Sequence, residues 1–170
     1  MLAIKKINLI ILPLCLFISN TIMAKDTETI KFSIVGSVVS KPQCQISDSK
    51  TIEINFGDNI GINNISSGKY EREIPYDITC DGESDELQLT LKISGNAVSF
   101  DPDNATVRTN EQENLGIKIF HDGKPFELDK SIPINANNIP KLHAVLIKND
   151  EGELIEGEFN ANATIEAEYQ

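Results

Sequence analysis

Few side chains in this sequence have the type and spacing that acid–base or nucleophilic chemistry requires. There are only two histidines, His121 and His143, and each lies within or next to a segment that alternates like a β-strand. Histidine is the usual acid–base group near neutral pH, but in that setting it is far more often a structural strand residue. No serine has the Gly-x-Ser-x-Gly context of a hydrolase. Carboxylates are abundant because the chain is acidic, so pairs of them do not indicate a glycosidase. We therefore predict no enzyme activity and no cofactor.

The acidic segment 101–104 comes nearest to a metal-binding motif. Asp101, Asp103 and Asn104 could suggest a calcium loop. An EF-hand loop needs further oxygen ligands and a closing glutamate at fixed spacing, and these are missing. The sequence Asp-Pro-Asp-Asn is also a strong turn former, so we expect a turn and no metal site.

Residues 1–24 are predicted to be a secretory signal peptide. Lys5 and Lys6 give a short positive start, residues 7–18 form a nearly unbroken apolar run, and Ala24 supplies a small residue at the cut. These features together are typical of a signal peptide, and the run is too short for a membrane span of about 20 residues. Cleavage after Ala24 removes 24 of 170 residues and leaves 146, which suits one domain.

The cysteine count indicates one disulfide and an oxidising compartment. Cys15 leaves with the signal peptide, and a lipid anchor on it is disfavoured because the preceding Leu14 is large. Cys44 and Cys80 remain, and two cysteines in an exported chain can pair in only one way. A metal site or a redox pair is the alternative, but there is no Cys-x-x-Cys and no nearby histidine. The two cysteines are 36 positions apart. Closing this loop stabilises the folded state by about 3–4 kcal/mol in the chain-entropy model. Such a bond implies a periplasm or a cell surface.

The charge of the chain excludes one class of partner. The formal net charge is −11, and loss of Lys5 and Lys6 makes it −13. A protein without a basic patch cannot release counterions from a phosphate backbone, so we expect no nucleic-acid binding. Solubility is the simplest role for the excess of carboxylates.

Alternation with a period of two runs through nearly the whole mature chain. Apolar side chains at every second position indicate strands with one buried and one exposed face. Asp122 and Gly123 form a hairpin signal between two such runs. No long segment has a convincing helical period, so we predict an all-β sandwich. The expected strands lie at residues 30–38, 52–56, 74–80, 87–93, 115–119, 142–148 and 158–170.

The last of these strands has the sharpest alternation and an inner face of small residues. Alanine packs little volume, so other side chains must fill the space above this face. In a generic sandwich the core of the protein itself would do so. The apolar positions are Phe159, Ala161, Ala163, Ile165, Ala167 and Tyr169, and the strand runs to Gln170.

The first strand of the mature chain allows a second interpretation. Its apolar face carries Ile30, Phe32, Ile34, Gly36 and Val38. A glycine at an apolar strand position suggests close approach to another backbone. The segment is therefore either the first strand of the domain or an arm that completes a different molecule by strand addition.

The sequence resembles subunits of chaperone–usher fimbriae, especially the minor tip and adaptor pilins of P-type and type 1-like pili. The resemblance covers nearly all of the mature chain, and it is the ordered set of motifs that is specific. Gln43 is a mild departure, because many relatives have proline directly before the cysteine. The matching residues are the alternating arm, residues 41–46, 54–57, 65–70 with Gly68, 74–80 and 115–119, and the C-terminal strand with Gly157 fourteenth from the end and Tyr169 next to last.

This resemblance implies an incomplete immunoglobulin-like β-sandwich that lacks its final strand and is completed by a donor strand from another subunit. Residues 25–39 would be the donor-strand extension and residues 40–170 the pilin domain. The C-terminal strand, from Gly157 to Gln170, would border a hydrophobic groove. A periplasmic pilus chaperone would fill that groove first, and an outer-membrane usher would exchange it for the arm of a neighbouring pilin. The protein would pass through the periplasm to a cell-surface fimbrium.

Several positions in the fibre are compatible with this sequence. On the resemblance of the whole sequence we expect a minor tip or adaptor pilin that supports cell adhesion. The alternatives are a major rod pilin, a terminator with a blocked groove, or a self-contained periplasmic or surface binding module. A secreted hydrolase would need a reactive side chain, and none is found in the sequence.

Overall fold

The computed structural model describes residues 28–38, 43–81 and 88–169. The predicted signal peptide and Gln170 lie outside the described residues. The chain divides into two units, Met1–Val38 and Val39–Gln170. In the first unit, residues 28–38 form no regular secondary structure, and their side chains are exposed. No helix among the described residues is long and apolar enough to cross a membrane.

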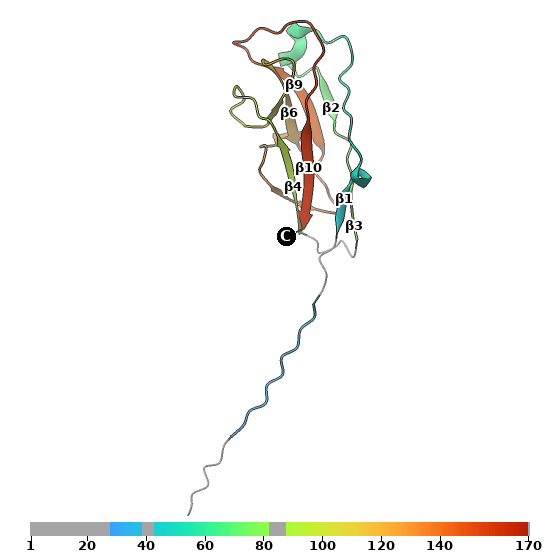
Figure 1. The fold of residues 1–170 in the computed structure, drawn as a ribbon, viewed down its shortest axis with the longest axis vertical. Helices are drawn as coiled ribbons and strands as arrows, with labels where there is room; N and C mark the ends of the chain where they lie inside the picture. Colours follow the sequence, from blue (N-terminus) through green and yellow to red (C-terminus); the bar gives the residue numbers. More distant parts are fainter. Residues whose placement is uncertain (1–27, 39–42, 82–87, 170) are drawn as a thin grey trace, which may run out of the picture. The chain divides into compact units, whose positions relative to one another are not determined.

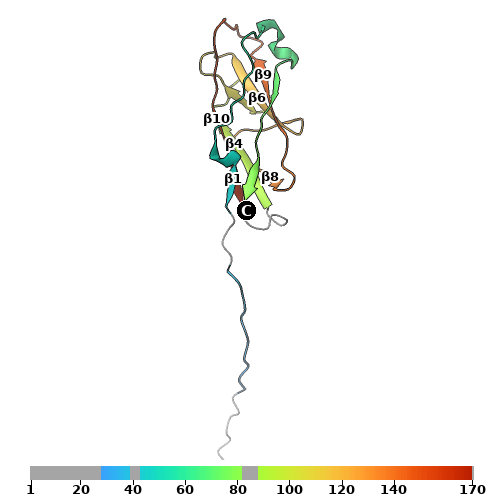
Figure 2. The same ribbon diagram turned by 90° about the vertical axis from the view of Figure 1, so that its right-hand side faces the viewer.

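The second unit consists of short strands and two 3-10 turns, and its described residues contain no α-helix. Figures 1 and 2 show the strands in two views. In chain order the elements are β1 (Cys44–Ile46), η1 (Ser47–Ser49), η2 (Ile62–Ser67), β2 (Glu71–Glu73), β3 (Ile78–Cys80), β4 (Gln88–Gly95), β5 (Thr106–Arg108), β6 (Leu115–His121), β7 (Lys124–Pro125), β8 (Ile132–Asn135), β9 (Leu142–Lys148) and β10 (Ala163–Tyr169).

Two antiparallel sheets enclose the core. One sheet has the order β10-β4-β8, and the other has the order β2-β9-β6-β5 with β7 added to β6. A separate pair joins β1 to β3. Leu91 and Ile93 of β4 pack in one cluster with Leu142 and Leu146 of β9, and all four side chains are buried. Burial of this apolar face drives the formation of strands that are individually too short to be stable.

Three of the seven predicted strands are confirmed. The alternation at residues 142–148 coincides with β9, and the segments at 87–93 and 115–119 correspond to β4 and β6. The hairpin predicted from Asp122 and Gly123 joins β6 to β7. Both residues have positive φ, 46° and 77°, as a two-residue turn of type I′ requires.

The other four predicted strands differ from the structure. Residues 30–38 form no strand. Residues 74–80 do not form one strand, because Pro75 lacks an N–H, and only Ile78–Cys80 belongs to a ladder. The last strand begins at Ala163 rather than near residue 158, because its partner β4 ends at Gly95, directly opposite Ala163. Residues 52–56 alternate in burial as predicted, but they form no ladder with any described strand.

The segment 101–104 is the predicted turn, and its aspartate has a structural role. The Asp101 carboxylate accepts hydrogen bonds from the backbone N–H of Ala105 at 3.0 Å, the Thr106 hydroxyl at 2.5 Å and the Lys118 ammonium at 2.8 Å. Burial would raise the pKa of Asp101, but the hydrogen bonds from Lys118, Thr106 and the backbone outweigh it and lower that pKa. This carboxylate therefore ties the turn to β6.

Candidate functional site: the uncovered edge of the last strand

The final strand, β10, is paired on one side only. Its seven residues pair with β4, from Ala163 opposite Gly95 to Tyr169 opposite Leu89. No described strand pairs with its other edge. An unpaired edge presents free N–H and C=O groups in a row, which is the template that strand addition requires.

The inward face of β10 is apolar but is not covered. Ile165 and Ala167 lie opposite Ile93 and Leu91, and these two residues of β4 are buried. On the inward face of β10, Ile165, Ala167 and Tyr169 are only half-buried, and Ala163 is exposed. A buried strand in a sandwich would not show this pattern, so apolar surface is missing its cover.

Ala163 is the exposed residue on the inward face of β10. Its partner across the ladder is Gly95, which has no side chain. A Cβ atom added to Gly95 would lie 3.4 Å from the side chain of Val107 and 3.5 Å from that of Ala163. These distances are ordinary van der Waals contacts, so the two small residues pack against the buried side chain of Val107.

The extended residues 52–56 lie near the start of this strand. The rings of Phe56 and Phe159 are 6.4 Å apart. The Arg72 guanidinium donates hydrogen bonds to the carbonyl oxygens of Asn55 at 3.1 Å and Phe56 at 3.0 Å. Ile52 and Ile54 pack only partly against the core. A strand placed along the free edge of β10 would therefore meet a second apolar flank.

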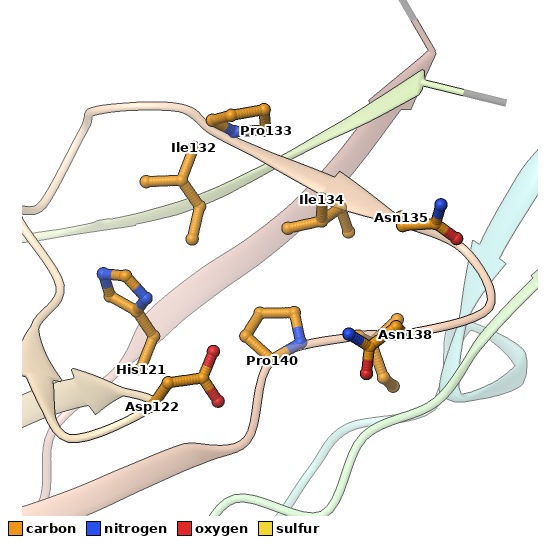
Figure 3. A pocket seen from close by; sticks show the side chains of 9 residues that line it. His121, Asp122, Ile132, Pro133, Ile134, Asn135, Asn138 and Pro140 are labelled. Atoms are coloured by element: carbon orange, nitrogen blue, oxygen red, sulfur yellow. The ribbon is translucent and has the colours of Figure 1, made fainter.

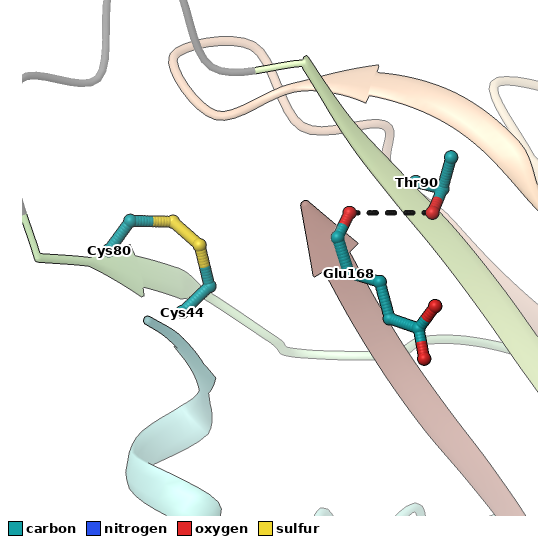
Figure 4. The surroundings of a disulfide bond; sticks show 4 residues. All are labelled: Cys44, Cys80, Thr90 and Glu168. Carbon is teal, nitrogen blue, oxygen red and sulfur yellow. Dashed lines mark hydrogen bonds between the residues drawn. A yellow bond between two sulfur atoms is a disulfide. The ribbon is translucent and has the colours of Figure 1, made fainter. Parts of the chain in front are cut away.

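The strand β1 lies beside the C-terminal part of β10, with Cα atoms of the two strands within 8 Å. The disulfide between Cys44 and Cys80 joins β1 to β3 at this place, as predicted, and the two cysteines are directly opposite in the ladder. Figure 4 shows the disulfide near Glu168, whose carbonyl oxygen accepts a hydrogen bond of 3.4 Å from the Thr90 hydroxyl.

The outward face of β10 is acidic and partly neutralised. Glu166 pairs across the ladder with Lys92, and the Lys92 ammonium lies 2.5 Å from its carboxylate. The hydrogen bond to Glu166 raises the pKa of Lys92. The inward and outward faces of this strand therefore differ sharply in polarity.

The predicted arm residues are all exposed in their own unit. Ile30 is 88% exposed and Phe32 is 81% exposed, and Ile34 and Val38 are exposed as well. No atom lies within 4 Å of the position that a Cβ of Gly36 would occupy. These apolar side chains therefore have no cover within the described residues of their own unit.

The two histidines have different surroundings. His143 of β9 forms a 2.9 Å ion pair with Glu71 of β2. His121 packs edge-on against Phe126 and lines an open pocket of about 670 Å³, in which Pro140 and Ile134 face it (Figure 3). The Glu71 carboxylate beside His143 could take part in acid–base chemistry, but neither histidine contacts a nucleophilic side chain among the described contacts. Among the described residues there is also no group of three or more side chains that could hold a metal ion.

The residues that hold the chain ahead of β10 were not predicted from the sequence. Gln112, in the loop between β5 and β6, bonds to the backbone of Ile155, and Glu111 bonds to Asn160. These contacts join residues more than 40 positions apart. Amide side chains in loops carry no periodic signal, so nothing in the sequence pointed to them.

An immunoglobulin-like sandwich whose last strand has one unpaired edge and a partly exposed inward face is typical of one class of protein, the subunits of chaperone–usher pili. The profile described as "Fimbrial protein" matches residues 30–170, and this chain belongs to that family. Its members are structural subunits of surface pili that polymerise with neighbouring pilins, and the family is not enzymatic.

Relatives and solved structures agree with this assignment. The fimbrial-like protein YfcQ of Escherichia coli K12 is 36% identical over 160 residues, covering 91% of this chain and 95% of YfcQ. YfcR of the same organism is 31% identical over 138 residues, covering 78% of this chain and 76% of YfcR. The P pilus rod subunit PapA has a similar fold, with a TM-score of 0.58, 22% identity, and coverage of 82% of this chain and 100% of PapA. The P pilus adaptor subunit PapF has a TM-score of 0.52, 23% identity, and coverage of 75% and 95%.

Proposed function

We propose that this protein is a minor subunit of a chaperone–usher fimbria that assembles by donor-strand exchange and supports adhesion. The observation that carries the proposal is the inward-facing but exposed Ala163 on a strand with a free edge. A strand inserted along β10 would pair with its backbone and cover its apolar face. The same insertion would shield the half-buried side chains of Ile52 and Ile54.

The arm supplies a segment of matching character. Ile30, Phe32, Ile34 and Val38 alternate with polar or smaller residues and are exposed. In donor-strand exchange they enter the groove of a neighbouring pilin, and Gly36 takes the position where no side chain fits. Main-chain hydrogen bonds provide affinity, and the alternate side chains provide selectivity.

The uncovered edge also requires protection before assembly. Exposed apolar surface beside an unpaired strand is an aggregation hazard. A periplasmic chaperone fills the groove with a strand of its own and holds the terminal carboxylate on Gln170. The usher then exchanges that strand for the arm of the next pilin, and the subunit reaches the cell surface.

Deletion of residues 25–39, with the signal peptide retained, tests the role of the arm. The truncated subunit should still co-purify with the chaperone, because its own groove is intact, but it should not insert into a neighbour. Wild-type levels of the truncated chain in isolated fimbriae would show that the arm is not a donor strand. A self-contained binding module predicts instead a stable monomer in a host without any chaperone.

Quantitative labelling of isolated fimbriae tests the position in the fibre. A minor subunit is present in a few copies per fibre and clusters at one place, whereas a rod subunit is the most abundant protein along the whole length. The proposal of a minor subunit rests on the resemblance of the sequence motifs. Uniform labelling along the rod would contradict it and would favour the rod alternative.

A further inference from the structure

The chain that leads into β10 is held by side chains rather than by a ladder. Residues 153–160 belong to no strand. Gln112, which is 8% exposed, reaches this segment from the loop between β5 and β6. Its Nε2 donates a 3.0 Å hydrogen bond to the carbonyl oxygen of Ile155, and its Oε1 accepts a 3.4 Å bond from the N–H of the same residue. One amide side chain thus takes the place of two ladder bonds.

A second set of contacts lies five residues further along. The N–H of Asn110 donates to the carbonyl oxygen of Asn160 at 2.8 Å. The N–H of Asn160 donates to the Glu111 carboxylate at 2.7 Å, and the Asn160 side-chain amide also donates to that carboxylate. Asn160 directly follows Phe159, so these bonds fix the backbone next to the ring that contacts Phe56.

The loop that makes these contacts is itself held firmly. The Thr109 hydroxyl donates a 2.6 Å bond to the carbonyl oxygen of Gln112. Asn114 Nδ2 donates to the carbonyl oxygen of Glu153 at 3.1 Å. Gly152 packs so closely on Asn114 that an added Cβ would lie 2.1 Å from its Cγ. The loop can therefore act as a fixed support for the segment ahead of β10.

We propose that Asn110, Glu111, Gln112 and Asn114 form a clamp, with Gln112 as its main positioning residue, which holds the approach to β10 so that one end of the strand-binding groove is preformed. The inference rests on the proposed function in naming the groove. Phe159 and Ala161 are then in place before any strand is inserted. Less of the receiving subunit therefore has to become ordered when the strand binds. Preorganisation of this kind raises affinity by removing the entropic cost of ordering.

Hydrogen exchange on the folded subunit tests the clamp without any strand partner. Gln112→Ala should speed exchange of the Ile155 amide by about tenfold or more, because one hydrogen bond and its support are lost. The matched control is Glu113→Ala, one residue away in the same loop and exposed. Amides of β4 and β9 should be unchanged. Equal acceleration of amide exchange in β4 and β9 would show general destabilisation and would overturn the proposal. An unchanged exchange rate of the Ile155 amide would overturn it as well.

Strand uptake tests the consequence for the groove. The chaperone-bound subunit is mixed with a synthetic peptide of residues 28–38, and peptide capture is followed by native mass spectrometry. Gln112→Ala should weaken capture by about tenfold relative to wild type and to Glu113→Ala, since roughly 1.4 kcal/mol corresponds to tenfold. Equal capture by all three proteins would overturn the role in preforming the groove. If the wild-type protein captures no peptide, insertion of this arm into the protein's own groove is contradicted, and the exchange comparison then decides the clamp alone.

Discussion

Substitution of Ala163 by aspartate should abolish strand insertion while leaving the free subunit folded. Ala163 faces the interior beside Gly95 but is exposed as long as the groove is empty. A carboxylate at this position therefore stays hydrated in the free subunit and lowers the free energy of unfolding only slightly. An inserted strand would cover it and strip its water while providing no cation.

The magnitude follows from this change in environment. The effective cost of burying an unpaired ion in a protein is several kcal/mol after relaxation. A cost of about 4 kcal/mol corresponds to roughly a thousandfold weaker binding. Ala163→Asn is polar but uncharged, so its cost should be about 1–3 kcal/mol, and its effect should be intermediate.

The assay compares these two variants with Thr164→Asp, which places the same charge one residue along on the outward, exposed face. Co-purification with the chaperone and incorporation into isolated fimbriae are measured for each variant. Circular dichroism and disulfide formation monitor folding. The expected order of incorporation is wild type and Thr164→Asp, then Ala163→Asn, then Ala163→Asp at background. Normal incorporation of Ala163→Asp, or equal loss in Thr164→Asp, would refute an inserted strand at this edge.

Three further predictions concern the stability of the folded sandwich. Asp101→Asn should lower the free energy of unfolding by about 3 kcal/mol, because the poorly exposed Lys118 loses its most buried partner. The pKa of Asp101 is lowered by folding, so its stabilisation is present above its unfolded pKa of about 3.9 and is lost as the pH falls through the folded value. Urea unfolding should therefore show a gap between wild type and variant that shrinks below about pH 4; a constant gap from pH 7 to pH 3 would contradict this. Replacing both Cys44 and Cys80 by serine should cost about 4 kcal/mol in the chain-entropy model, and an unchanged urea midpoint would count against it. Gly116→Ala should lower the thermal midpoint, with a cost of about 1–3 kcal/mol, because its Cβ would lie 2.3 Å from a side-chain carbon of β5. A midpoint equal to that of wild type would show that β5 can move aside.

Local chemistry made much of the fold predictable. The alternation of residues 142–148 is the burial pattern of β9, because each second side chain of that strand enters the core. Asp122 and Gly123 both tolerate positive φ, so their hairpin could be read from two residues. Cys44 and Cys80 could be paired because no other cysteine remains after removal of the predicted signal peptide.

The remaining features depend on partners that a single strand does not reveal. Residues 52–56 have the alternation of a strand, but a ladder also needs a neighbour, and the described chain provides none. Ala163 begins β10 because β4 ends opposite it, which no local pattern encodes. Gln112 contacts Ile155 across 43 residues, and its role arises only when the two loops meet.

The disulfide between β1 and β3 also decides how a fibre of such subunits would carry mechanical load. In a fibre built by strand insertion, tension enters each subunit through residues 25–39 and reaches Cys44 first. The covalent bond passes that tension directly to Cys80, so the 36-position loop between the cysteines bears none of it. At about 3.4 Å per residue, roughly 120 Å of chain is thereby withheld from extension. Each subunit would resist stretching on its N-terminal side through a covalent bond, and its elasticity would come from the remainder of the sandwich.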